Sequence, residues 1–183
     1  TPISSMPSSP SALRTWLQLL RAPNLFTVPG DPLAGFLLAS GGLVDLRLGG
    51  AILASLCFYS HGLLLNDLAD LEEDRRERPD RPLPSGAARP GAVWTVAILL
   101  AVAALGLCFA IGPLAFAVGL ALLGCVITYN LWTKKIAGVG AVNMAWMACL
   151  LAMAALLTVV PFTMADARTA KIVLVVSGDE RMQ

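Results

Sequence analysis

The stretch GGAILASLCFYSHGLLLNDLADLEED, residues 49–74, decides the fold. Its first eighteen residues, which end at Asn66, are almost entirely apolar. That length is close to the roughly 20 residues that a helix needs to cross a bilayer. Carboxylates then follow at high density in a protein whose charged residues make up only 14% of the chain. The stretch therefore predicts a membrane helix that ends in an acidic cluster.

The acids of this cluster fall on one face of the predicted helix. At about 100° per residue, Asp67, Asp70 and Asp74 lie within about 100° of Asn66, and the two arginines that follow directly point elsewhere. Like charges on one face repel, so we expect a helix that keeps them together to hold a cation. Oxygen ligands of this kind suit Mg²⁺ or Ca²⁺ better than zinc, and Mg²⁺ usually completes its shell with water and substrate phosphate.

The composition is that of a membrane protein. Hydrophobic residues make up 57% of the chain, and the charged fraction of 14% is well below the 25% or so of an average soluble domain. The net charge of +1 and the lack of an RNA-binding motif give no reason to expect a nucleic-acid partner. All four cysteines lie in apolar runs without metal-ligand spacing, so we interpret them as packing residues.

The apolar segments predict an all-α protein, a polytopic bundle of transmembrane helices. Five candidate spans lie in one domain over residues 14–161, and prolines break the first of them. We expect residues 1–13 to form a disordered tail and residues 162–183 to form a divergent tail without a span. The candidate spans cover residues 16–43, 49–66, 91–112, 113–132 and 136–160.

The basic residues between the spans predict an orientation. Apart from Arg47, they fall before the first span, between the second and third, and between the fourth and fifth, which puts them on one side of the membrane. Cytoplasmic loops carry the excess of Lys and Arg. The N-terminus and the Asp-rich loop over residues 66–90 are therefore expected to be cytoplasmic.

The loop RPDRPLPSG, residues 78–86, follows the acids directly. Its prolines predict a rigid, extended path that holds Arg78 and Arg81 near the acidic face. Guanidinium groups suit phosphate, so acids for a metal beside arginines for phosphate form the combination that a diphosphate needs. The alternative, an ordinary positive-inside loop, explains the arginines but not the carboxylates on one face.

The pattern NDxxDxxxD at residues 66–74, followed by RxxRPLPSG at residues 78–86, resembles the first aspartate-rich motif of the UbiA superfamily of intramembrane prenyltransferases. The segment LRAPNLFTVPGDPLAG, residues 20–35, resembles the first helix of that superfamily, particularly its MenA-like and EboC-like bacterial branches. The spacing YxxxxK at residues 129–134 matches a further feature, so the resemblance covers most of residues 14–150.

The resemblance implies a nine-helix bundle around a central cavity that opens to lipid, in a bacterial-type inner membrane. It also implies two aspartate-rich motifs that bind a prenyl diphosphate through Mg²⁺, and transfer of the prenyl group to a lipophilic acceptor. About five of the nine helices and none of the second motif are found here, so we expect a truncated N-terminal half. The alternative is a non-catalytic membrane protein that binds prenyl diphosphate or a partner without turnover.

Individual roles also follow from the resemblance. Asp67, Asp70 and Asp74 would hold Mg²⁺, and these acids with Lys134 would be the catalytic residues. A second class of enzymes with intramembrane aspartates, the CDP-alcohol phosphotransferases, needs glycine and arginine between the aspartates, which this segment lacks. The acceptor, the prenyl length and the oligomeric state are not readable. The expected substrate-binding residues are Asn24, Asn66, Arg78, Arg81, Tyr129 and Asn143.

Some of these residues have alternative interpretations. Lys134 could belong to an ordinary positive-inside pair, although the YxxxxK spacing favours the family role. Asn24 is expected to face a cavity, whereas Asp31 is left open between a cavity and the solvated membrane edge. Asn143 is explained equally well by a hydrogen bond between helices. His61 projects away from the acids, which favours a helix–helix hydrogen bond.

Overall fold

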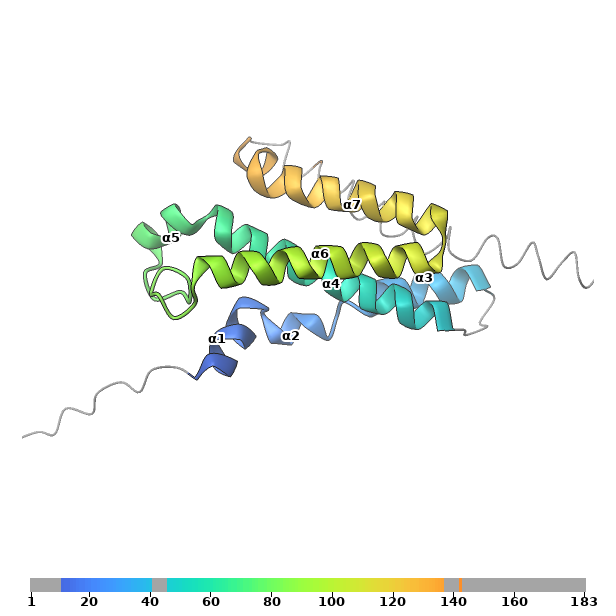
Figure 1. Cartoon of the computed structure of the whole chain (residues 1–183), viewed down its shortest axis with the longest axis horizontal. Helices are drawn as coiled ribbons and strands as arrows, with labels where there is room; N and C mark the ends of the chain where they lie inside the picture. The colour runs from blue at the N-terminus through green and yellow to red at the C-terminus, as the bar shows by residue number, and fades with distance from the viewer. Residues whose placement is uncertain (1–10, 41–45, 137–141, 143–183) are drawn as a thin grey trace, which may run out of the picture.

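The computed structural model describes residues 11–40, 46–136 and 142 (Figure 1). Helices joined by turns make up these residues and no β-strand occurs among them, so the predicted all-α class is confirmed for this part of the chain. The helices are α1 (Ala12–Leu19), α2 (Ala22–Leu25), α3 (Gly30–Ser40), α4 (Leu46–Ala69), α5 (Leu71–Glu77), α6 (Pro90–Ile111), α7 (Pro113–Leu131) and the short 3₁₀ helix η1 (Thr133–Lys135).

Three of these helices, α4, α6 and α7, are long and apolar enough to cross a membrane. They lie where the sequence predicted the second, third and fourth spans, and α4 extends beyond its prediction at both ends. At the N-terminus, α1 already begins at Ala12, inside the expected tail. The fifth predicted span falls outside the described residues except at positions 136 and 142, and the expected C-terminal tail lies wholly outside them.

The first predicted span is divided into α1, α2 and α3. The first division falls at Arg21, whose backbone is left-handed with φ of 45° and ψ of 55°. Pro23 then lies in the first turn of α2, where its missing N–H costs no helical hydrogen bond. A second division covers residues 26–29, after which Gly30 opens α3. Prolines lie at both divisions, and the structure adds a strained turn at Arg21.

The three long helices run along the long axis of the molecule, with α4 packed mainly against α6 (Figure 1). The buried face of α6 carries the small residues Ala97, Ala101 and Ala104, each no more than 9% exposed. Small side chains let helices approach closely in a membrane. Helices α6 and α7 also approach closely at Gly119, where an added Cβ would lie 3.0 Å from Cys108 Sγ. These close approaches fix the frame on which the site is built.

The opposite face of α6 is apolar and exposed. An apolar surface of this kind is unusual for a protein in water and fits contact with lipid. Its large hydrophobic side chains are Trp94, Ile98, Leu99, Val102 and Phe109.

The loop over residues 78–89 folds back on one end of the bundle. Leu83 is buried there and belongs to a cluster with Leu64 of α4. The loop consists of successive turns, and the N–H of Ala88 donates to the carbonyl of Pro82 at 2.9 Å. The predicted extended path is therefore wrong. Proline has the φ that the first corner of a turn requires, and burial of Leu83 draws the loop inward.

Candidate functional site

Helices α4 and α5 meet at Asp70, where the acidic segment bends. Asp70 has φ of −93° and ψ of 3°, so the continuous helix predicted through the acids is wrong at this position. The N–H groups of Asp70 and Asp74 still donate to the carbonyls of Asn66 and Asp70, at 3.0 and 2.8 Å. The bend keeps these backbone groups paired and holds the acids at one end of the bundle.

Asp74 is buried against two arginines of the loop that follows it. Its carboxylate side chain is 6% exposed, with Oδ2 2.7 Å from Arg81 Nη1 and Oδ1 3.9 Å from Arg78 Nη1. Arg81 Nη1 also lies 3.9 Å from Asp67 Oδ1. One guanidinium group therefore faces two carboxylates. It offsets the repulsion that the sequence predicts between them.

Asp70 is paired with a residue from far along the chain. Lys134, in η1 after the end of α7, places Nζ 2.5 Å from Asp70 Oδ1. The same ammonium group donates to Asn66 Oδ1 at 3.2 Å. The Lys134 side chain is only 13% exposed, so the ammonium group is largely withdrawn from water. This contact joins the end of α7 to the acidic end of α4.

Arg21 approaches the third acid, Asp67. Arg21 Nη2 lies 3.6 Å from Asp67 Oδ1, which is screened from water and has no hydrogen bond among the described residues. A non-glycine residue in the left-handed region costs about 1–3 kcal/mol, so the surrounding structure must hold Arg21 in place. The Asp67 oxygen keeps an unused capacity to accept a hydrogen bond or bind a cation.

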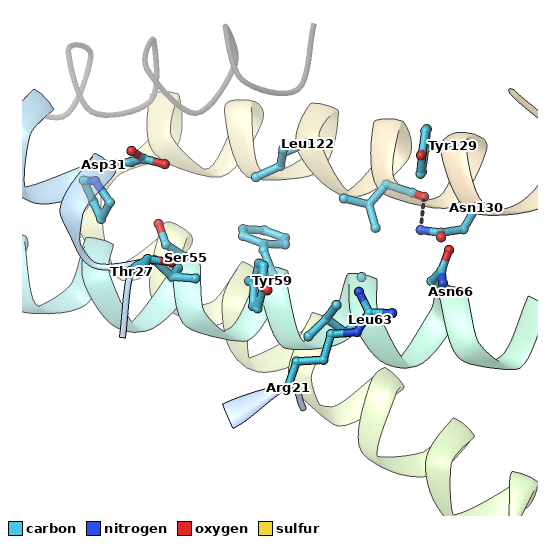
Figure 2. A pocket seen from close by; sticks show the side chains of 15 residues that line it. Arg21, Thr27, Asp31, Ser55, Tyr59, Leu63, Asn66, Leu122, Tyr129 and Asn130 are labelled. Carbon is cyan, nitrogen blue, oxygen red and sulfur yellow. Dashed lines mark hydrogen bonds between the residues drawn. The ribbon is translucent and has the colours of Figure 1, made fainter. Parts of the chain in front are cut away.

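A largely apolar cavity of about 590 Å³ lies between α4 and α7, and residues between Arg21 and Pro32 form part of its wall (Figure 2). This volume is within the usual range of small-molecule sites. Asn66, Tyr129 and Asn130 form a polar group at the same end of the cavity, as Figure 2 shows. The main apolar lining residues are Val28, Phe58, Leu63, Leu122 and Val126.

A second pocket of about 520 Å³ lies beside the acids and is polar. Its wall comes from α1, the end of α4, α5 and the loop after α5. Arg21 lines both this pocket and the apolar cavity, so this residue lies between the two spaces. The charged residues of the polar pocket are Arg21, Asp67, Glu77, Arg78, Asp80 and Arg81.

Comparison with known proteins decides the family. A model of the UbiA prenyltransferase family matches residues 32–176, most of the chain. The chain belongs to the UbiA prenyltransferase family. With three apolar helices of spanning length, this UbiA-family chain is an integral membrane protein. The predicted superfamily is confirmed.

Archaeal relatives of this UbiA-family chain carry a common name. This chain is 38% identical over 104 residues to the digeranylgeranylglyceryl phosphate synthase of Ignicoccus hospitalis. The match covers 56% of this chain and 33% of that protein. It is 27% identical over 137 residues to the synthase of Methanoculleus marisnigri, covering 75% of this chain and 49% of that one. It is 36% identical over 76 residues to the synthase of Methanocaldococcus jannaschii, and this match covers 40% of this chain and 26% of that protein. The resemblance of the first helix to the MenA-like and EboC-like branches stays a prediction.

A solved structure supports the same fold. A structure reported for digeranylgeranylglyceryl phosphate synthase in membranes superposes with a TM-score of 0.77 and 23% identity. The match covers 81% of this chain and 54% of that one. The matched regions span about a quarter to a half of the length of the sequence relatives named above. The fold is therefore that of a UbiA-type membrane bundle, over part of its length.

The structure brings together most of the residues that the sequence predicted for a site. Tyr129 lines the apolar cavity, whereas Asn24 is exposed on α2 and does not line it. Asp31, which the sequence left open, does line the cavity. Asn143 lies outside the described residues. The predicted residues gathered at the acidic end are Asn66, Asp67, Asp70, Asp74, Arg78, Arg81 and Lys134.

The structure bears on the predicted metal site and on the predicted role of His61. Within the described residues, no three acidic, histidine or cysteine side chains come close enough to hold a metal ion by themselves. Each predicted metal ligand instead faces a basic side chain. His61 Nδ1 lies 2.9 Å from the carbonyl of Ala97 on α6, which confirms the predicted helix–helix hydrogen bond.

Reasoning from the sequence missed two residues of the site. The sequence presents Arg21 only as one of the basic residues of the positive-inside pattern and as part of residues 20–35, because a left-handed backbone at arginine has no sequence signature. Asn130 was passed over, although a polar residue within an apolar span is a signal in its own right. Asn130 is 3% exposed and lines the cavity beside Tyr129.

Proposed function

We propose that the protein transfers an isoprenyl group from a prenyl diphosphate to a lipophilic acceptor within the membrane, in a Mg²⁺-dependent reaction. The observation that carries the proposal is the junction at Arg21 between an apolar cavity and a polar pocket. A prenyl diphosphate joins a hydrocarbon chain to a polyanion, so it needs two such spaces side by side. Membership of the UbiA family supports the same chemistry.

The basic side chains around the acids suit the diphosphate. Arg78 and Arg81 present guanidinium groups from the loop, Arg21 presents one from the turn before α2, and Lys134 presents an ammonium group from η1. Each is already held against a carboxylate, which fixes its position. Charge-assisted hydrogen bonds to phosphate oxygens have the same geometry as those to carboxylates, so these groups can exchange one anion for the other.

The reaction begins with cleavage of the bond between the allylic carbon and the diphosphate oxygen. Negative charge then builds on the leaving diphosphate and positive charge on the allylic group. Arg21, Arg81 and Lys134 stabilise the leaving group because they are positioned before the charge develops. The acceptor forms the new bond to the allylic carbon and releases a proton. The apolar walls of the cavity, with Phe58 and Leu122, keep bulk water away from the cation.

The acids fit a hard divalent cation in part. Asp67 offers an oxygen without a hydrogen bond among the described residues, and Asp70 and Asp74 follow it on the same segment, although the three side chains are not gathered closely enough to hold a metal ion by themselves. We propose that these three acids supply the protein ligands of Mg²⁺, one or two of them to an ion, when the diphosphate supplies further oxygens, since Mg²⁺ commonly binds one or two carboxylates plus substrate phosphate. When bound, the ion would act as a Lewis acid toward the diphosphate oxygens.

The orientation and the substrates belong to the proposal as well. The positive-inside pattern supports a cytoplasmic N-terminus and a cytoplasmic acidic loop. The names of the archaeal relatives support geranylgeranyl diphosphate as the first donor to test, with a lipid of the glyceryl phosphate class as acceptor.

The test is a transfer assay in membranes that contain the protein. They receive labelled geranylgeranyl diphosphate, Mg²⁺ and a lipid extract, and label is followed into the neutral and phosphate-bearing lipids. We expect Mg²⁺-dependent transfer that Asp70→Asn abolishes and the exposed Glu73→Gln leaves intact. No transfer, with an archaeal relative active in the same assay, would reject the enzyme. Diphosphate binding without transfer would establish the non-catalytic alternative.

A further inference from the structure

Asn130 is a buried polar residue whose oxygen has no partner among the described residues. It lies on α7 and is 3% exposed. Its Nδ2 donates to the carbonyl of Val126, one turn earlier, at 2.9 Å. This bond fixes which way the amide points, because the carbonyl of Val126 can only accept. The Oδ1 atom is screened from water and has no hydrogen-bond donor in the described part of the chain.

A buried acceptor atom without a donor lowers the stability of the fold. Leaving a buried acceptor unsatisfied costs about 1–3 kcal/mol, and such atoms in native proteins usually mark a place where a ligand or water completes the bond. Asn130 lines the apolar cavity, at the end where Asn66 and Tyr129 also lie (Figure 2). Of the other residues of α7 that line the cavity, Leu122 and Val126 offer only apolar side chains, and Tyr129 carries a hydroxyl group.

No hydrogen bond joins Asn130 Oδ1 to a charged side chain among the described residues. Lys134 Nζ is directed to Asp70 and to Asn66 Oδ1, and the arginines contact Asp67 and Asp74. A diphosphate is an acceptor of hydrogen bonds and gains nothing from the carbonyl oxygen of an amide. The group that suits Asn130 Oδ1 is therefore a donor, which the described residues do not supply and which a molecule in the apolar cavity can carry.

We propose that Asn130 is a specificity-determining residue that accepts a hydrogen bond from a hydroxyl group of the lipophilic acceptor. The proposal deepens the proposed function and rests on it for the identity of the second substrate. It assigns the acceptor to the class of lipophilic alcohols. A hydroxyl held by Asn130 lies at the end of the cavity that leads, through Asn66, to Asp70 and Lys134.

The test compares two probes that differ in one donor. Protein in lipid nanodiscs is loaded with tritiated farnesol, which is then displaced by unlabelled farnesol or by farnesyl methyl ether, without diphosphate. We expect the wild-type protein to prefer the alcohol by on the order of tenfold, the value of one buried hydrogen bond. Asn130→Leu should remove this preference.

A matched control lies on the same helix. Thr128 Oγ1 donates to the carbonyl of Gly124 at 2.7 Å, and Thr128 does not line the cavity, so Thr128→Val removes a comparable bond without touching the cavity. It should keep the preference for the alcohol. Equal binding of both probes to the wild-type protein would overturn the proposal even if Asn130→Leu did not fold. So would a preference that survives in Asn130→Leu. Failure of diphosphate binding or transfer, with the preference intact, would reject the proposed function alone.

Discussion

Asp74 and Asp70 lie on the same acidic segment but are neutralised in different ways. Asp74 is 6% exposed, and its partners Arg78 and Arg81 are four and seven residues away in the loop that follows. Asp70 is 23% exposed, and its partner Lys134 is 64 residues away, after α7. The local contacts shape a loop, whereas the distant contact joins two membrane helices. The difference shows that the cations proposed to meet a diphosphate are also used to hold the fold together.

The largest effect is expected from breaking the local contact. Arg81→Gln leaves Asp74 buried with only the more distant Arg78 as a partner. It also removes one of the two guanidinium groups that face Asp67. We expect the free energy of unfolding to fall by about 2–4 kcal/mol, because an uncompensated charge remains buried. The measurement is unfolding by denaturant in a fixed detergent.

The control uses the same substitution at an exposed pair. Arg75 contacts Glu72, and both side chains are at least half exposed. Arg75→Gln should change the free energy of unfolding by no more than about 0.5 kcal/mol, since exposed ion pairs contribute little. If the free energy of unfolding falls equally in both variants, the buried ion pair of Asp74 does not stabilise the loop.

The distant contact is measured by a double-mutant cycle. Lys134→Met and Asp70→Asn, alone and together, should give a coupling of about 1–2 kcal/mol in the free energy of unfolding, because both groups are partly buried. A coupling below about 0.3 kcal/mol would mean that α7 is held at α4 by apolar packing alone. The same cycle on Arg75 and Glu72 provides the baseline for an exposed pair.

The two contacts also show how far the sequence alone leads. The nearness of Arg78 and Arg81 to the acids follows from their spacing, and the apolar runs are long enough to indicate α4, α6 and α7. Lys134 was assigned to the site by family resemblance, because nothing in its spacing relates it to Asp70. The bend at Asp70 and the turns of the loop depend on tertiary contacts, above all the burial of Leu83.

A smaller effect is expected from changing the close approach of α6 and α7, which positions Lys134 against Asp70. An alanine at Gly119 would meet Cys108 Sγ at 3.0 Å and Cβ at 3.3 Å, so α6 and α7 must separate slightly. We expect Gly119→Ala to lower the free energy of unfolding by about 1 kcal/mol, the cost of mild overpacking. The Lys134–Asp70 coupling should fall with it.

Gly124 is the matched control on α7. An added Cβ there meets nothing within 4 Å among the described residues, so Gly124→Ala should gain about 0.5–1 kcal/mol from helix propensity alone. Equal responses at the two glycines would show that the α6–α7 approach at Gly119 is looser than the structure has it.

The most direct test of the site is binding of the diphosphate itself. Labelled geranylgeranyl diphosphate is titrated onto protein in nanodiscs with and without Mg²⁺, using the wild-type protein, Asp67→Asn and the exposed Glu73→Gln. We predict Mg²⁺-dependent binding that weakens roughly tenfold or more in Asp67→Asn, which loses a charged ligand, and stays unchanged in Glu73→Gln. Asp67→Asn that binds as tightly as the wild-type protein, with the same Mg²⁺ dependence, would contradict the assignment of the acids to the diphosphate.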